Sequence, residues 1–188
     1  MTGWLQARVD EFTALRGMVV RSWSGVEMAV RGGDGDRPEF DGPDVPCLQC
    51  WQLSADLSSG RRVVVGTYQD DGYWGLRPDV APAGNDRPGV PAPGYRSRAL
   101  PEVPTGRITD VDVVIEGQIL AEVAVHIGAQ GVLLIAGEAD EDHAGRMWWR
   151  RLDESVLVFT NPIAAERMIW APARTQPTAA PPAEGAGL

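Results

Sequence analysis

The pattern of apolar and polar residues predicts a short helix and then a strand at the start of the chain. Leu5, Val9 and Phe12 recur with helical spacing, and Gly17 is placed to end that helix. Residues 26–30 then alternate between apolar and polar, as in a half-buried strand. The stretch that follows, GGDGDRPEFDGPD, is predicted to form a polar loop.

A β-hairpin is predicted next. Its first strand has apolar residues at alternate positions, namely Trp51, Leu53, Ala55 and Leu57. Ser58-Ser59-Gly60 supplies the turn, RRVVVGTY returns, and a further short strand is predicted at residues 73–76. Residues 78–106 carry seven prolines, a density that excludes regular structure and predicts a long surface connection.

Strand patterns resume in the second half. Residues 111–115 and 123–127 alternate, and VLLIAG and SVLVF are apolar runs of strand length, separated by an acidic turn at GEADEDH. Asn161-Pro162 is a helix-start signal, and Pro172 is placed to end the helix. The tail at residues 172–188 is predicted to be disordered.

The predicted fold class is mainly antiparallel β (α+β), with two meander-like halves and a short helix at each terminus. The halves can be aligned, because residues 60–71 match residues 131–142 without a gap. Identities are few, so a duplication and a chance match both stay open. One compact unit is expected, made of a first half at 1–77, a Pro-rich connection at 78–106, a second half at 107–171 and the tail at 172–188.

Charge narrows the range of partners. The 188 residues have a net charge of −9 and a pI of about 4.7. A negative field repels phosphate backbones and anionic lipids, so we expect neither nucleic acid nor a membrane as partner and favour a basic protein. All 17 basic residues are arginine, which indicates a GC-rich genome and hence a bacterial source.

Composition also bears on compartment. With 44% hydrophobic residues and seven tryptophans, the sequence predicts a folded, tryptophan-rich protein with a sizeable core. The N-terminus lacks the pattern of a signal peptide, and no apolar run is long enough to cross a bilayer. Two cysteines without a secretory signal indicate a reducing compartment, so a cytoplasmic protein is expected.

Cys47-Leu-Gln-Cys50 is the motif that most directly suggests chemistry. The local period of two predicts a strand on which Cys47 joins the face of Trp51, while Cys50 faces the other way. Three residues of rise separate the Cα atoms by roughly 10 Å, beyond the limit of about 7 Å for a disulfide. A zinc site completed by His126 and His143 lacks the usual spacing. We therefore expect buried structural thiols, with no metal and no other cofactor.

No catalytic pattern is found elsewhere. The acidic stretches do not follow calcium-loop spacing and are interpreted as solvated loops. His126 and His143 are interpreted as surface residues, and motifs for nucleophilic, nucleotide-binding or zinc-protease chemistry are absent from the sequence. Trp148 and Trp149 are expected to point to opposite faces of a strand, one into the core and one toward an arginine or an interface. No catalytic residue is predicted, and a non-enzymatic role is favoured.

Three stretches of the second half, GRITDVDVVIEG, GVLLIAGEADED and MWWRRLDESVLVF, resemble in pattern the small acidic immunity proteins of bacterial polymorphic toxin systems. The resemblance implies a non-enzymatic protein that occludes the active site of a basic toxin, with opposite charge speeding the encounter. The candidate contacts are carboxylates of the two acidic stretches and one tryptophan, namely Asp34, Asp36, Asp41, Glu138, Asp140, Glu141, Asp142 and Trp149.

Two alternatives stay open. One is a small-molecule-binding protein or enzyme with an aromatic-lined pocket between the halves, for which the candidate lining residues are Trp51, Trp74, His126 and Trp148. The other is a structural subunit that self-assembles through strand edges and exposed aromatic residues.

Overall fold

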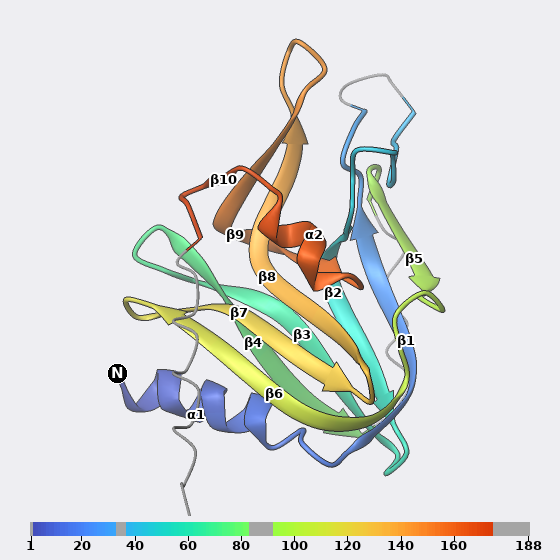
Figure 1. Ribbon diagram of the computed structural model, residues 1–188, viewed down its shortest axis with the longest axis vertical. Coiled ribbons are helices and arrows are strands. Elements are labelled where there is room, and N and C mark those ends of the chain that lie inside the picture. The colour runs from blue at the N-terminus through green and yellow to red at the C-terminus, as the bar shows by residue number, and fades with distance from the viewer. Residues whose placement is uncertain (1, 33–36, 83–91, 175–188) are drawn as a thin grey trace, which may run out of the picture.

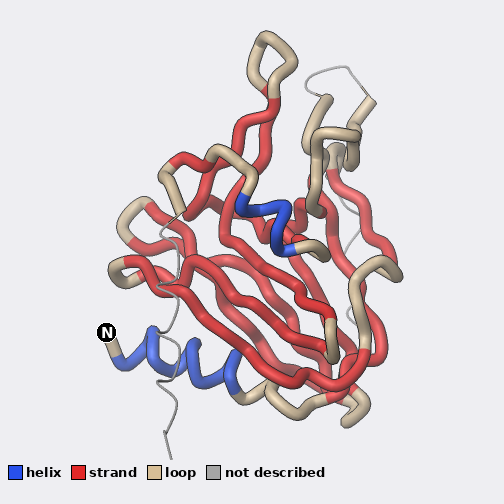
Figure 2. Tube along the Cα trace, in the orientation of Figure 1, coloured by secondary structure: helices blue, strands red, loops and turns tan. Residues whose placement is uncertain are grey.

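The computed structural model describes residues 2–32, 37–82 and 92–174 (Figure 1). In this part of the chain, two short helices accompany strands that pair mostly antiparallel (Figure 2), so the predicted fold class is confirmed. The elements are α1 (Gly3–Thr13), β1 (Val19–Met28), β2 (Leu48–Leu57), β3 (Arg61–Asp70), β4 (Tyr73–Pro82), β5 (Tyr95–Ala99), β6 (Gly106–Glu116), β7 (Ile119–Ile127), β8 (Gln130–Glu141), β9 (Met147–Phe159), α2 (Pro162–Glu166) and β10 (Trp170–Ala171).

The sheet closes on itself. Strands pair in the order β9–β8–β7–β6–β1–β2, and β2 also pairs with β9. Strand β2 can do so because its ladder is divided, with residues 48–50 paired to β9 and residues 53–56 paired to β3. The other strands extend this ring: β3 and β4 continue from β2, β5 pairs with β1, and β10 runs parallel to β9.

The main hydrophobic core fills the inside of the closed sheet. Alternate strand residues point inward, as the period-two patterns predict, and α1 covers one end with the fully buried Leu5 and Phe12. Thr2 caps α1, because its hydroxyl oxygen accepts a hydrogen bond from the Leu5 backbone N–H at 3.3 Å. The predicted helix is confirmed, but it ends at Thr13 with Ala14 as its C-cap, and Gly17, with a φ of +83°, lies in the turn that follows.

A second core lies on the outer face of β8 and β9. Outward residues such as Leu133 and Leu157 are covered by α2 and β10, and Trp149 packs edge to face against Trp170 with ring centroids 6.1 Å apart. Both faces of β8 are therefore buried over part of its length. This double burial explains why its sequence is a continuous apolar run and does not alternate.

The β8–β9 pair bends at a β-bulge. Gly137 pairs with Arg151, but the residue before it pairs with Val156, so residues 152–155 lie outside the ladder. A Cβ at Gly137 would lie 2.5 Å from the Arg150 carbonyl oxygen, so only glycine fits at the bend. Beyond the bend, the end of the hairpin projects from the closed sheet, at the opposite end of the molecule from α1 (Figure 1).

A buried ion cluster holds the C-terminal segment against the sheet. Glu122 on β7 is 1% exposed and accepts hydrogen bonds from Arg151 Nη2 at 2.8 Å and from Arg174 Nη2 at 2.6 Å. Arg151 is also 1% exposed, pairs with Glu116, and donates to the Ala173 carbonyl oxygen at 3.1 Å. Two arginines thus balance two carboxylates where water is excluded.

A second buried carboxylate, Glu27 on β1, holds β5 in place. It is 1% exposed and lies between Arg96 and Arg98 of β5, whose Nε atoms are 2.5 and 2.7 Å from its Oε2. The short strand β5 therefore depends on ion pairs as well as on its five ladder positions against β1.

The sequence predicts no regular structure for residues 78–106, and this is wrong at both ends. Strand β4 continues through Pro78 to Pro82, and β5 occupies Tyr95–Ala99. In the described sheet β4 is an edge strand paired with β3, where a proline that cannot donate a hydrogen bond costs little. Residues 83–91 lie outside the described chain.

The end of the chain also departs from prediction. The acidic residues 138–141 belong to β8 and not to a turn, and the helix that begins at Pro162 ends at Glu166. Of the tail expected to be disordered, residues 172–174 are described, and Arg174 forms an ion pair with Glu122. Residues 175–188 lie outside the described chain.

The two aligned segments each lie in the middle strand of a three-stranded meander. Strands β2–β3–β4 and β7–β8–β9 are both antiparallel meanders, and residues 60–71 and 131–142 include their middle strands. Their surroundings differ, since β4 is an edge whereas β9 is enclosed between β8 and β2. A duplication stays a prediction.

Candidate functional site

The two cysteines lie in different hydrophobic cores. Cys50 is fully buried inside the closed sheet, and Cys47 is 7% exposed in the second core. Burial raises the pKa of both thiols far above the usual value, which disfavours the reactive thiolate. The predicted face of Trp51 is wrong, because the β1–β2 register shifts there and leaves Trp51 outside, 45% exposed.

A cleft separates the segment after β1 from the outer end of β8. It has a volume of about 300 Å³ and is lined by residues 29–32 and 138–141. Its charged lining residues are the carboxylates Glu138, Asp140 and Glu141 and the basic Arg31. We call this hollow the acidic cleft.

Arg31 joins the two acidic stretches that the sequence singles out. Its Nη2 donates to Asp44 at 2.5 Å and its Nε donates to Glu141 at 3.1 Å. The hydrogen bond from Arg31 lowers the pKa of Asp44 below its usual range. The loop that ends at Asp44 and the end of the β8–β9 hairpin therefore lie side by side (Figure 1).

Glu138 is a half-buried carboxylate surrounded by other carboxylates. Its pKa is raised to about 7, and burial is the largest cause. The negative charges of Asp153, Glu154 and Asp140 add to the shift, while Arg150 opposes it. Near neutral pH this carboxyl is only partly ionised, because burial and then the surrounding negative charge disfavour its ionised form. A cation supplied from outside would remove that repulsion.

The predicted contact carboxylates have different surroundings. Glu138, Asp140 and Glu141 share the acidic cleft. Asp142 lies at the hairpin turn and pairs with Arg146 at 3.0 Å. The Asp41 side chain is 86% exposed and lies 3.8 Å from Arg96. Asp34 and Asp36 lie outside the described residues.

The tryptophan proposed as a partner contact is misplaced. Trp149 is 5% exposed and belongs to the second core, so it cannot touch a partner while the domain is folded. Trp148 points to the other face of β9, where the Arg150 guanidinium lies 4.6 Å from its ring centroid. Trp148 and Trp149 point to opposite faces of β9, as the strand period predicts, but the residue at the surface is Trp148 and not Trp149.

A second hollow, which we call the aromatic groove, is formed by residues of β2, β3 and β4. It has a volume of about 210 Å³ and lies over β3, between Trp51 of β2 and Trp74 of β4. Gly66 and Thr67 of β3 line it, and Arg77 and Asp79 of β4 add a cation and a carboxylate. The groove therefore combines aromatic rings with a few polar groups, as small binding sites do.

The aromatic pocket expected between the halves is only partly formed. Trp51 and Trp74 share the groove, but both come from the first half of the chain. His126 lies on β7, where its Nε2 is 2.8 Å from Asp112 Oδ2, and Trp148 lies on the outer end of β9. Neither of these two lines the groove.

Glu154 links the acidic cleft to the aromatic groove. Its backbone carbonyl oxygen accepts a hydrogen bond of 2.5 Å from the hydroxyl of Thr67, which lines the groove. Its carboxylate raises the pKa of Glu138, which lines the cleft. The bulge of β9 therefore connects a residue that lines the groove with a residue that lines the cleft.

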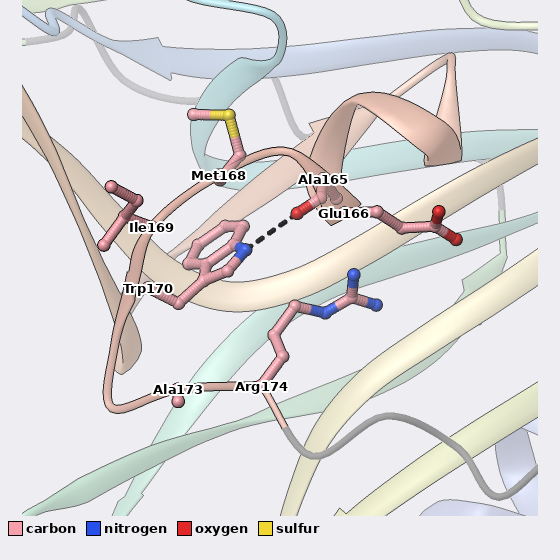
Figure 3. Close-up of a pocket in the computed structure, with 7 residues that line it drawn as sticks. All are labelled: Ala165, Glu166, Met168, Ile169, Trp170, Ala173 and Arg174. Atoms are coloured by element: carbon pink, nitrogen blue, oxygen red, sulfur yellow. Dashed lines mark hydrogen bonds between the residues drawn. The ribbon is translucent and has the colours of Figure 1, made fainter.

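A larger hollow of about 580 Å³ is formed by residues 165–174 (Figure 3). Within it the Trp170 indole N–H donates to the Ala165 carbonyl oxygen at 2.8 Å, and Arg174 lies at one end. Arg174 is already bound to Glu122, so its charge holds the segment in place. Arg174 is the last residue of the described range, and we assign no ligand to this hollow.

Sequence reasoning missed Arg31, Asp153 and Glu154. The last two act on Glu138 because the bulge in β9 places residues 152–155 outside the ladder. The only sequence signal of that bulge is the polar interruption RRLDES between two apolar stretches of a single strand. Such an interruption is also typical of a turn, so a period analysis alone does not distinguish the two.

Comparison of the chain with protein-family models, with curated proteins and with solved structures gives no match. The described residues contain no helix whose length and apolar character would let it cross a membrane. They also contain no group of three or more His, Cys, Asp or Glu side chains placed to hold a metal ion. A function has to be inferred from the geometry of the cleft and the groove.

Proposed function

We propose that the chain is a non-enzymatic, acidic protein-binding domain that neutralises a basic toxin partner, as immunity proteins do. The acidic cleft is the observation that carries the proposal. Its carboxylates outnumber its one arginine, and crowding and burial raise the pKa of Glu138 to about 7. A basic partner that binds here relieves this repulsion, whereas a neutral partner does not.

The use of arginine elsewhere in the chain supports the proposal. Many arginines are committed to carboxylates of the same chain, and these include Arg16, Arg31, Arg62, Arg96, Arg98, Arg151 and Arg174. These ion pairs contribute to folding. The chain as a whole has a net charge of −9, which acts on a partner. The negative field of the chain speeds the approach of a basic protein. Its carboxylates would also compete with an anionic substrate for the basic side chains of that protein.

The test is co-expression with the products of the adjacent genes. We expect one of them to be a basic protein that arrests growth when expressed alone and is harmless together with this chain. The purified pair should associate faster at low salt than at high salt, because screening weakens steering between opposite charges. Adjacent genes whose products neither inhibit growth nor bind the chain would rule the proposal out.

A charge-reversal pair locates the contact. Asp140→Arg places a cation at the exposed edge of the acidic cleft, and we expect it to slow association about tenfold at low salt. Asp10→Arg makes the same change in charge on α1, at the opposite end of the molecule, and should leave the rate near that of the wild type (Figure 1). Equal effects of the two variants would mean that the cleft is not the contact surface.

A further inference from the structure

The aromatic groove presents two tryptophans that the fold does not bury. Trp51 is 45% exposed and Trp74 is partly exposed, on strands that flank β3. The register shift at Trp51 is what turns its indole outward, because the next inward residue, Leu53, is fully buried in the main core. An exposed aromatic surface of this kind marks a binding site more often than it serves stability.

The groove is held in shape by contacts on its sides. Tyr95 of β5 packs edge to face against Trp51, with ring centroids 6.4 Å apart and an interplanar angle of 90°. Thr67 is fixed by its hydrogen bond to the Glu154 carbonyl oxygen. Gly66 leaves the space open, because a Cβ at that position would meet no heavy atom within 4 Å. A site that is already formed loses little entropy when it is filled.

The charges in and around the groove favour a cation. Asp79 lines it, and its carboxylate is only loosely paired with Arg77, at 3.6 Å, with both side chains about half exposed. Glu154 adjoins the groove through Thr67, and the chain as a whole carries a net charge of −9. An incoming cation therefore meets the side chains of two tryptophans and the Asp79 carboxylate, which is only loosely paired with Arg77.

The protein already uses the same chemistry within its own chain. Arginine guanidinium groups lie over the rings of Trp4, Phe40 and Trp148 at 5.5, 4.3 and 4.6 Å from the centroids. A guanidinium is planar, weakly hydrated and able to bind a carboxylate with two hydrogen bonds, so it fits a groove between indoles better than an ammonium does.

From these observations we propose that the aromatic groove binds the guanidinium group of an arginine side chain supplied by the partner. The guanidinium would stack on Trp51 or Trp74 and bind the Asp79 carboxylate in exchange for Arg77. This inference rests on the proposed function in one respect, namely that the partner is basic. It adds a specific contact to the general attraction of the acidic cleft.

The binding can be tested without the partner. The probe is N-acetyl-arginine methylamide, added to the full chain labelled with ¹⁵N, and the readout is the indole N–H signal of each tryptophan. We expect saturable shifts of the Trp51 and Trp74 signals with a dissociation constant in the millimolar range, which corresponds to about −4 kcal/mol. The neutral isostere N-acetyl-citrulline methylamide and N-acetyl-lysine methylamide should bind more weakly.

Two variants and one control connect the signal to the groove. Gly66→Leu adds a side chain to the groove at a position where its Cβ meets no heavy atom within 4 Å, and it should abolish the saturable shift while the unfolding midpoint stays near that of the wild type. Trp51→Ala should weaken probe binding about fivefold or more. Trp4→Ala removes a tryptophan of similar exposure, 48%, from α1 and should leave probe binding unchanged.

Several results would overturn the inference. Equal binding of the arginine and citrulline probes would show that charge plays no part. Shifts caused by methyl glucoside but not by the arginine probe would make the groove a saccharide site. Unchanged binding to Gly66→Leu would place the probe elsewhere. If the groove variants leave partner affinity intact while Asp140→Arg weakens it, only this inference fails and the proposed function stands.

Discussion

Two carboxylates on adjacent strands have opposite environments. Glu122 on β7 is 1% exposed and is bound by Arg151 and Arg174. Glu138 on β8 is half-buried and faces mainly other carboxylates, which together with burial raise its pKa to about 7. Both have lost water, but only Glu122 has gained hydrogen-bonded cations in return. The difference separates charge that holds the fold together from charge that is available to a partner.

Two tryptophans repeat the contrast. Trp149 is 5% exposed and packs against Trp170 in the second core. Trp51 is 45% exposed and is supported at one side by Tyr95. The covered residues lie under α2 and the C-terminal segment, whereas the uncovered ones surround the two hollows next to the bulge of β9. Stability and the proposed binding are thus assigned to different regions of one closed sheet.

The largest effect on stability is expected at the buried ion cluster around Glu122. Arg151→Ala leaves Glu122 and Glu116 without their shared buried cation, and we expect it to lower the free energy of unfolding by about 3–5 kcal/mol. Urea denaturation followed by tryptophan fluorescence measures this loss. The double variant Arg151→Ala with Glu122→Gln should recover part of it, because the remaining side chain is neutral. A loss below about 1 kcal/mol would mean that water reaches the cluster.

Truncating the two tryptophans should separate them by stability. Trp149→Ala creates a cavity in the second core and should cost about 3–5 kcal/mol, while Trp51→Ala should cost less than about 1 kcal/mol. Both are measured by urea denaturation followed by far-UV circular dichroism, which does not depend on the number of tryptophans. Equal losses would show that Trp51 is as important to packing as its buried counterpart, and the groove would then be structural.

These results separate what the sequence can predict from what it cannot. The helix α1, the hairpin β2–β3 and the alternating strands β6 and β7 follow from local period and turn residues, so pattern analysis finds them. The closure of the sheet through β2 and β9 depends on contacts between segments about a hundred residues apart, as in the pairing of Cys50 with Val156. No local pattern marks such a pairing.

The candidate site was predictable only in part. The acidic stretches are visible in the sequence, and Arg31 does bring them together in the fold. The aromatic groove depends on a one-residue register shift at Trp51, and a shift of one residue moves a side chain to the other face of a sheet. The strand period therefore placed Trp51 in the core. The strand period does not decide which of Trp148 and Trp149 faces inward, and the choice of Trp149 as the partner contact was wrong because Trp149 is the buried one.

A smaller effect is expected for the cysteines, of which Cys47 lies in the second core and Cys50 in the main core. Cys47→Ala combined with Cys50→Ala removes two buried sulfur atoms from separate cores and should cost about 1–3 kcal/mol in total. Bound zinc, measured by mass spectrometry of the native protein, should be absent from both proteins. Stoichiometric zinc in the wild type that disappears in the variant would contradict our interpretation of the thiols as structural.

The smallest effect on stability is expected at Glu138, and it has a defined sign. The pKa of this carboxyl is raised on folding from an ordinary value of 4.5 to about 7, so the folded protein binds a proton that the unfolded chain releases. Its contribution to stability is therefore fully present below pH 4.5 and is lost as the pH rises to about 7. Glu138→Gln should remove this decline and, because solvent screens a half-buried group, should raise the free energy of unfolding at pH 8 by less than about 1 kcal/mol.

Urea denaturation of wild type and Glu138→Gln between pH 5 and pH 8 measures that decline directly. A further variant tests its cause: Glu154→Gln removes one of the neighbouring charges and should lower the pKa of Glu138, followed by the ¹³C shift of its carboxyl carbon. An unchanged Glu138 titration in that variant would mean that the charge of Glu154 does not act on Glu138. Burial, Asp153 and Asp140 would then be the remaining causes of the raised pKa, and Glu154 would have no part in attracting a basic partner to the acidic cleft.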